Sequence, residues 1–111
     1  MEPQPRTIEL YVTEEGAAPF AVWMDGLRNA QARAQTQRRL ARVRLGLLGD
    51  CKSVGGGVYE LRIATGPGYR VYCAQVGQNV VLLLCGGDKR TQAADIAKAK
   101  AYWADYQERT T

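Results

Sequence analysis

The sequence contains no histidine and only three cysteines, and none of the cysteines are in a C-x-x-C spacing. An odd number of widely spaced cysteines (Cys51, Cys73 and Cys85) argues against a disulfide framework. Together with the lack of histidine, it also argues against a structural zinc site. No cluster of Asp and Glu is placed to hold metal ions, which excludes two-metal chemistry. We therefore expect no metal and no cofactor.

Long apolar runs are missing too. No stretch approaches the about 20 apolar residues that a membrane helix requires. The N-terminus, MEPQPRTIELY, has neither the basic start nor the apolar core of an export signal. We expect a protein of the reducing cytoplasm with no membrane partner. Without repeats, low-complexity runs or linkers, residues 1–111 are expected to form one domain with its own core.

What the chain does have is positive charge, concentrated in its middle. The net charge is +4, but residues 28–90 hold eleven Lys or Arg against three Asp or Glu, a local charge of +8, which leaves −4 for the two ends. A basic middle with acidic flanks points to an anionic partner, nucleic acid first. The alternative is that the arginines, taken singly, only keep the surface soluble.

Residues 58–74, VYELRIATGPGYRVYCA, have the pattern of a β-hairpin around a TGPG turn. Alternation places the apolar side chains of both arms on one face and the polar ones on the other: Glu60, Arg62, Arg70 and Tyr72. Matching the apolar faces restricts the register, and the register that closes a three-residue loop sets Arg62 opposite Arg70 and Glu60 opposite Tyr72. Facing arginines destabilise a short hairpin, and a bound polyanion would reverse that effect.

The remaining elements follow from hydrophobic spacing: a strand over 7–12, helices over 17–27 and 29–47, a strand buried on both faces over 79–85, and a helix over 92–107. In the first strand Ile8, Leu10 and Val12 share the face expected to be buried. Gly49 is expected to end the second helix, and Thr91 to cap the last. We predict a flexible connection over the glycine-rich residues 51–57.

The predicted order is β-α-α-β-β-β-α, an α+β domain with a mainly antiparallel sheet and helices packed on one face. In this order and spacing, the segments GVYELRI, GPGYRVYCA and LLLCGGDKRTQAADIAKA resemble the RelE/ParE superfamily of bacterial type II toxins. The resemblance is greatest to its HigB-like and phage Gp49-like "addiction module killer" group, and it covers about residues 6 to 106.

The resemblance implies a RelE-like fold and a cytoplasmic toxin encoded beside an antitoxin, usually a small helix-turn-helix protein. RelE-like and HigB-like members cleave mRNA on the translating ribosome, whereas ParE-like members poison DNA gyrase. Ribosome and mRNA are therefore the expected partners, and a homodimer is a further option.

The resemblance also assigns three catalytic positions. The second-strand arginine of the family falls on Arg62, the arginine of the GYR motif on Arg70, and the lysine of the GGDK motif on Lys89. We hypothesise that the two arginines clamp the scissile phosphate and that a desolvated Lys89 acts as the base. The histidine and the C-terminal tyrosine that assist some RNA-cleaving relatives are missing here.

Six further residues are candidates for RNA binding: Arg38, Arg39 and Arg42 of the second helix, Glu60 and Tyr72 of the hairpin, and Arg90 at the start of the last helix. Glu60 or Tyr72 would orient the nucleotide. The arginines of the second helix would contact ribosomal RNA, with a steep salt dependence, or an acidic segment of the antitoxin.

A purely structural reading is also open, in which Arg62 pairs with Glu60 or Asp88 and Lys89 only decorates a helix start. Three functions follow from these alternatives. The first is a metal-independent, ribosome-dependent mRNA endonuclease toxin. The second is a ParE-like gyrase inhibitor that acts by binding, and the third is a non-toxic domain that binds nucleic acid or protein.

Overall fold

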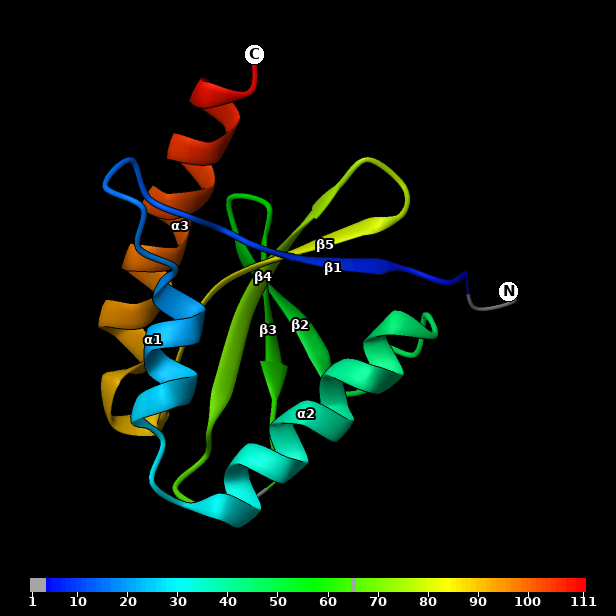
Figure 1. The fold of residues 1–111 in the computed structure, drawn as a ribbon, viewed down its shortest axis with the longest axis vertical. Helices are drawn as coiled ribbons and strands as arrows, with labels where there is room; N and C mark the ends of the chain where they lie inside the picture. The colour runs from blue at the N-terminus through cyan, green and yellow to red at the C-terminus, as the bar shows by residue number, and fades with distance from the viewer. Residues whose placement is uncertain (1–3, 65) are drawn as a thin grey trace.

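The computed structural model describes residues 4–64 and 66–111. The elements follow in the order β1 (Thr7–Leu10), α1 (Pro19–Gly26), α2 (Ala30–Arg44), β2 (Cys51–Gly55), β3 (Val58–Arg62), β4 (Arg70–Val76), β5 (Val80–Gly87), the 3-10 turn η1 (Lys89–Thr91) and α3 (Gln92–Arg109) (Figure 1). The strands form one sheet in the order β1-β5-β4-β3-β2. Among the described residues, β1 and β5 pair in parallel and the other neighbouring strands pair antiparallel. The predicted α+β class with a mainly antiparallel sheet is confirmed.

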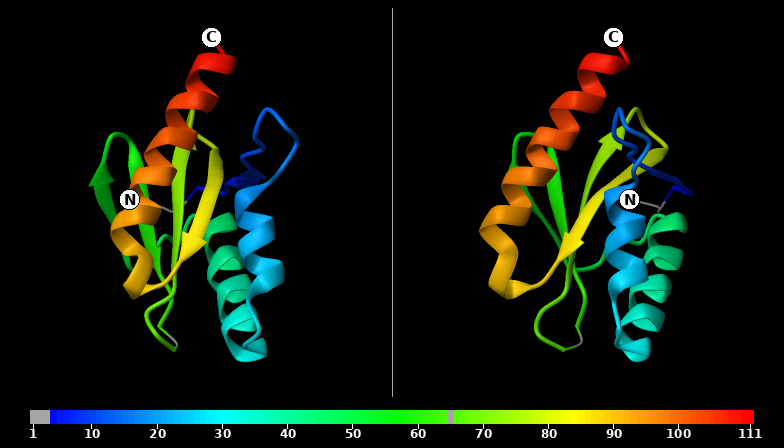
Figure 2. Two further views of the ribbon diagram at one scale, coloured as in Figure 1. Left: turned by 90° about the vertical axis from the view of Figure 1, so that its left-hand side faces the viewer. Right: turned by 60° about the vertical axis from the view of Figure 1, so that its left-hand side comes forward.

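Helices cover both faces of this sheet, with α3 on one side and α1 and α2 on the other (Figure 2). Phe20 of α1 and Leu40 of α2 pack into one core cluster. The other cluster lies under α3 and includes Leu82, Leu84 and Ala99. The expectation of helices on one face therefore holds for α1 and α2 only. The apolar run of β5 is buried on both sides and so requires cover on both.

Two glycines at the end of β5 allow this double cover. A Cβ built on Gly86 would collide with the ring of Trp23 from α1. A Cβ built on Gly87 would collide with the carboxylate of Asp95 from α3. The adjacent residues face opposite sides of the sheet, so each admits one helix. None of the helices in the described residues is long and apolar enough to cross a membrane.

Residues 51–55 form the edge strand β2, so the predicted flexible connection is wrong. The strand pairs with β3 from Cys51 opposite Leu61 to Gly55 opposite Val58, with a register shift before Gly55. Gly57, at φ +85°, lets the following turn approach α3, and a Cβ there would lie 2.7 Å from the indole Nε1 of Trp103. The glycines provide close packing rather than freedom.

The end of the second helix also differs from prediction. Helix α2 ends at Arg44, and Gly46 at φ +85°, not Gly49, follows its C-cap. The N–H of Gly46 donates to the carbonyl of Val43 and the N–H of Leu47 to that of Arg42, the two bonds of a Schellman motif.

The buried face of the N-terminal strand was also predicted wrongly beyond Ile8. Tyr11 is 3% exposed and stacks on Tyr102 with ring centroids 5.0 Å apart. Leu10 and Val12 are each 43% exposed. The strand ends at Leu10, so the alternation that would bury Val12 does not continue.

Candidate nucleic-acid site

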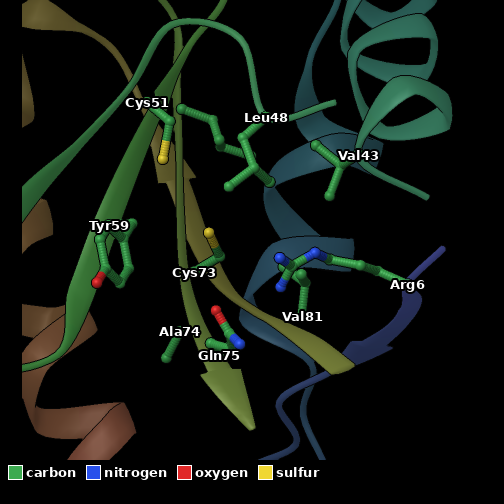
Figure 3. Close-up of a pocket in the computed structure, with 10 residues that line it drawn as sticks. Arg6, Val43, Leu48, Cys51, Tyr59, Cys73, Ala74, Gln75 and Val81 are labelled. Atoms are coloured by element: carbon green, nitrogen blue, oxygen red, sulfur yellow. The ribbon is translucent and has the colours of Figure 1, made fainter. Parts of the chain in front are cut away.

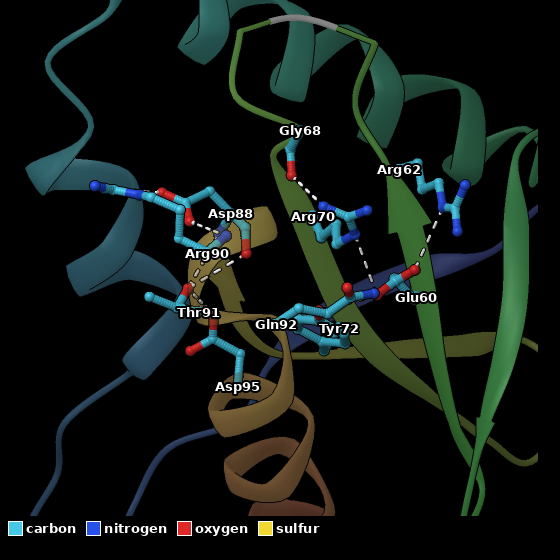
Figure 4. Close-up of polar contacts among 10 residues, drawn as sticks. All are labelled: Glu60, Arg62, Gly68, Arg70, Tyr72, Asp88, Arg90, Thr91, Gln92 and Asp95. Carbon is cyan, nitrogen blue, oxygen red and sulfur yellow. Dashed lines mark hydrogen bonds and ion pairs between the residues drawn. The ribbon is translucent and has the colours of Figure 1, made fainter.

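The hairpin register is confirmed, with Arg62 opposite Arg70 and Glu60 opposite Tyr72. Glu60 lies at the centre of the site and is fully buried (Figure 4). Its Oε2 accepts hydrogen bonds from the Tyr72 hydroxyl at 3.0 Å and from Gln92 Nε2 at 2.8 Å. Arg62 Nε lies 3.4 Å from Oε1, and Arg70 Nε lies 3.3 Å from Oε2. We refer to these five residues as the Glu60 cluster.

The hydrogen bonds keep Glu60 ionised. Burial alone would raise its pKa, but the bonds from Gln92, Tyr72 and Arg62 and the charge of Arg70 outweigh burial and hold the pKa below its ordinary value of 4.5. Burial and the bond to Glu60 together raise the pKa of Tyr72, which therefore remains a neutral donor. A negative charge is thus fixed beneath two guanidinium groups.

Acid is expected to destabilise the protein through Glu60. Because folding lowers this pKa, the ionised carboxylate contributes stability that is complete above pH 4.5 and is lost as the pH falls through the folded-state pKa. Thermal unfolding of wild type and Glu60→Gln between pH 7 and about pH 3 measures this effect. The difference in Tm between wild type and Glu60→Gln should narrow below pH 4.5. A difference that stays constant would contradict the lowered pKa of Glu60.

The two arginines differ in exposure. The side chain of Arg62 is 42% exposed, whereas that of Arg70 is 9% exposed and also donates from Nη1 to the carbonyl of Gly68 at 2.6 Å. An incoming phosphate can reach Arg62 directly, with Arg70 supplying charge just below the surface. The pairing of Arg62 with Glu60, expected from the structural reading, is present, and it leaves much of Arg62 in solvent. The carboxylate of Glu60 pairs with both Arg62 and Arg70 and so offsets the repulsion between these facing arginines.

Lys89 lies beside Arg70. Its backbone N–H donates to the carbonyl of Pro67 in the hairpin loop at 3.3 Å. A Cβ built on Gly68 would lie 3.0 Å from Arg70 Nη1 and 3.4 Å from Lys89 Cβ, so both side chains border the same glycine. Lys89 is exposed. The sequence-based expectation of a desolvated Lys89 is therefore not met in the protein by itself, and a bound ligand would have to remove this side chain from water.

The 3-10 turn η1, which leads into α3, is capped by Asp88 together with Thr91. Thr91 occupies the N-cap position of α3 as predicted, but its side chain makes no capping hydrogen bond to that helix. The Asp88 carboxylate accepts from the N–H of Arg90 at 2.9 Å, and the Thr91 hydroxyl accepts from the N–H of Asp88 at 3.3 Å, which forms a capping box. The side chain of Arg90 is 84% exposed, pairs with Asp88 and points away from the Glu60 cluster (Figure 4). The structure therefore does not bring Arg90 together with the other candidates.

A groove of about 540 Å³ lies between α2 and the end of β3. Its lining includes Arg38, Arg39 and Arg42 from α2, Arg62 from β3, and a single carboxylate, Asp50. Arg39 fixes the wall, because its Nη2 donates to the carbonyl of Asp50 at 2.8 Å and its Nε to that of Arg62 at 3.3 Å. We refer to this feature as the α2 groove. It joins the arginines of the second helix to the exposed edge of the Glu60 cluster.

Comparison with known proteins identifies the family. Residues 25–103, which include β3, β4, the Glu60 cluster and Lys89, match the family described as "Phage derived protein Gp49-like (DUF891)". The chain belongs to the Gp49-like family. An uncharacterized protein of Haemophilus influenzae is 48% identical over 81 residues, which cover 73% of this chain and 82% of the relative. Membership of this addiction-module family supports a toxin that pairs with an antitoxin.

The cysteines of this Gp49-like protein are not suited to nucleophilic catalysis. Cys51 and Cys73 line a second, largely apolar pocket of about 130 Å³, with Arg6 at its rim (Figure 3). Burial raises the pKa of Cys73 and of Cys85 to about 12, and it also raises the pKa of Cys51. The thiols stay protonated and are weak nucleophiles. The described residues also contain no group of three or more His, Cys, Asp or Glu that could hold a metal ion.

Three residues of the Glu60 cluster have roles that the sequence did not reveal. Glu60 and Tyr72, expected to orient a nucleotide, are both fully buried. Tyr72 donates to Glu60, which in turn contacts the two arginines and Gln92. Gln92 was missed, because its bond to Glu60 joins residues 32 positions apart. The one sequence feature that pointed to such a partner was Glu60, on the same hairpin face as two arginines. Once that face is buried, the carboxylate of Glu60 requires further hydrogen-bond donors.

Proposed function

We propose that this Gp49-like protein is the toxin of a type II toxin–antitoxin pair and that it cleaves mRNA on the ribosome as a metal-independent endoribonuclease. The observation that carries the proposal is the cation set at one edge of the sheet: Arg62 and Arg70 on a shared buried carboxylate, with Lys89 beside Arg70. Cleavage of RNA adds negative charge to the phosphate in the transition state. Cations held in place before the reaction stabilise that charge.

In the proposed reaction Arg62 binds the scissile phosphate through its Nη groups while its Nε stays on Glu60. Bound RNA covers Lys89, the proposed proton acceptor. The 2′-oxygen attacks the phosphorus as its proton passes to Lys89. The P–O5′ bond breaks as the 5′-oxygen takes a proton from solvent. The products are a 2′,3′-cyclic phosphate and a 5′-hydroxyl.

The ribosome supplies the positioning in this proposal. A chain of 111 residues has little surface with which to align a long substrate, and holding the message in a near-attack geometry can remove a large part of the barrier. The resemblance to HigB-like and RelE-like toxins supports this target, and an antitoxin, expected from the family, would silence the toxin in the cytoplasm.

The test is cleavage by purified protein added to translating ribosomes, with the 5′ ends of the mRNA mapped. Wild type is expected to cleave, and Arg70→Ala to lose nearly all cleavage because Arg70 pairs with Glu60 and its guanidinium group borders the same glycine as the Cβ of Lys89. Undiminished cleavage by Arg70→Ala would refute the assignment. Thermal unfolding of Arg70→Ala and of the charge-retaining Arg70→Lys separates loss of fold from loss of catalysis.

A supercoiling assay with DNA gyrase, run in parallel, addresses the second function. Inhibited supercoiling with intact mRNA would replace the nuclease by a gyrase inhibitor. Expression without growth arrest would exclude both toxins and leave a binding domain.

A further inference from the structure

We infer that the α2 groove holds single-stranded RNA by its sugar–phosphate backbone, next to the scissile phosphate at Arg62. The inference rests on the proposed function, because it identifies the path of that substrate. It is tested by binding alone, without cleavage.

The charge of the groove calls for a polyanion. Four arginines and one aspartate line it. Arg38 and Arg42 are exposed and form no ion pair within the described part of the chain. Arg39 and Arg42 line the groove together, so their like charges repel one another. A row of phosphates would turn this repulsion into attraction.

The size and spacing of the groove suit one strand. Its volume of about 540 Å³ falls in the range of roughly 300–1,000 Å³ that encloses a small ligand, so it can hold about one or two nucleotides but no duplex. Arg38 and Arg42 are one helical turn apart, about 6 Å along the axis of α2. Their guanidinium groups can therefore follow successive phosphates of an extended strand.

The lining predicts contact with the backbone rather than with bases. None of the described residues that line the groove is aromatic, so it offers no ring on which a base could stack. Ala41, Ile63 and Ala64 add only small or aliphatic surface. Guanidinium groups match the geometry of phosphate oxygens. Binding should therefore depend strongly on salt and little on sequence.

The groove also leads to the reaction site. Arg39 binds the backbone carbonyl of Arg62, so the wall of the groove and the strand that carries the exposed guanidinium are held together. Arg62 lines the groove and at the same time contacts Glu60. A strand lying along α2 would thus deliver a phosphate to the Glu60 cluster.

The experiment measures binding of a fluorescent single-stranded hexanucleotide, 2′-O-methylated throughout so that it cannot be cleaved, by anisotropy over a range of salt concentrations. The double variant Arg38→Gln/Arg42→Gln is expected to reduce the slope of log K against log salt by about 1.4, roughly 0.7 for each phosphate that no longer meets an arginine. Relative to about 1 M salt, where the two affinities converge, this corresponds to a roughly 25-fold loss of affinity at about 0.1 M salt. Arg44→Gln, an exposed arginine of α2 that does not line the groove, should bind as wild type does.

An RNA duplex with the same number of phosphates provides the second arm, and it should bind more weakly and respond little to the double variant. Unchanged affinity and slope in the double variant would overturn the inference. Stronger duplex binding that depends on Arg38 and Arg42 would also overturn it and assign the groove to ribosomal RNA. Normal binding by the double variant while wild type cleaves mRNA refutes only the groove, and groove-dependent binding without any cleavage refutes only the nuclease.

Discussion

Replacing Arg62 with alanine is expected to slow mRNA cleavage on the ribosome by about 10²–10³-fold, the usual cost of removing one fixed group that stabilises transition-state charge. The fold should remain intact, because Arg62 is 42% exposed and Glu60 keeps Arg70, Tyr72 and Gln92 as partners when Arg62 is removed. Single-turnover kinetics should show the loss mainly in kcat rather than in KM, since the contact strengthens as charge develops.

The matched control for this variant is Arg44→Ala, which removes an exposed arginine at the end of α2, outside both the Glu60 cluster and the α2 groove. It loses the same charge without touching the proposed chemistry and should cleave as wild type does. Equal losses in the two variants would mean that only the overall positive charge matters, and the assignment of Arg62 would fail.

Replacing Glu60 with alanine is expected to lower the free energy of unfolding by about 3–5 kcal/mol, the typical cost of removing one partner of a buried ion pair. The variant leaves the largely buried Arg70 without its carboxylate and leaves two donors, from Tyr72 and Gln92, without an acceptor. Urea unfolding followed by circular dichroism measures the change. Glu60→Gln should lose less, because its amide oxygen can still accept from Tyr72 and Gln92.

Glu108→Ala is the control for this effect, because Glu108 is exposed near the end of α3. Its unfolding free energy should change by less than about 0.5 kcal/mol. If Glu60→Ala were equally mild, water would have to reach Arg70 easily, and the arginines could not be held in position before substrate binds. Should Glu60→Ala fail to fold, Glu60→Gln still separates the two cases.

The hairpin register could be predicted because one side of each arm is apolar, which restricts the register to those that bury both apolar sides, and a short connecting loop then favours the observed one. The double-sided burial of β5 could likewise be predicted from its continuous apolar run. The edge strand β2 could not, since its glycines are typical of loops. The turn that follows β2 packs closely against Trp103 of α3, because Gly57 has no side chain, and this long-range contact cannot be predicted from the local sequence.

For the site, the sequence indicated the residues better than their roles. Arg62 and Arg70 were found because they face each other across the hairpin, and Lys89 through the resemblance. The burial of Glu60 could not be foreseen, because it depends on where α3 packs. The hydrogen bond of Gln92 to Glu60 spans 32 positions, and no local pattern reports a contact of that range.

The two glycines at the end of β5 each allow a different helix to pack against the sheet, α1 at Gly86 and α3 at Gly87. A methyl group at Gly86 would press on Trp23 and disturb α1, on the face of the sheet away from α3. A methyl group at Gly87 would press on Asp95 and lift the first turn of α3, and with it the Gln92 amide that steadies the carboxylate under the arginines. Because each glycine lacks a side chain, Gly86 affects the packing of α1, whereas Gly87 affects the position of Gln92 and so the proposed site.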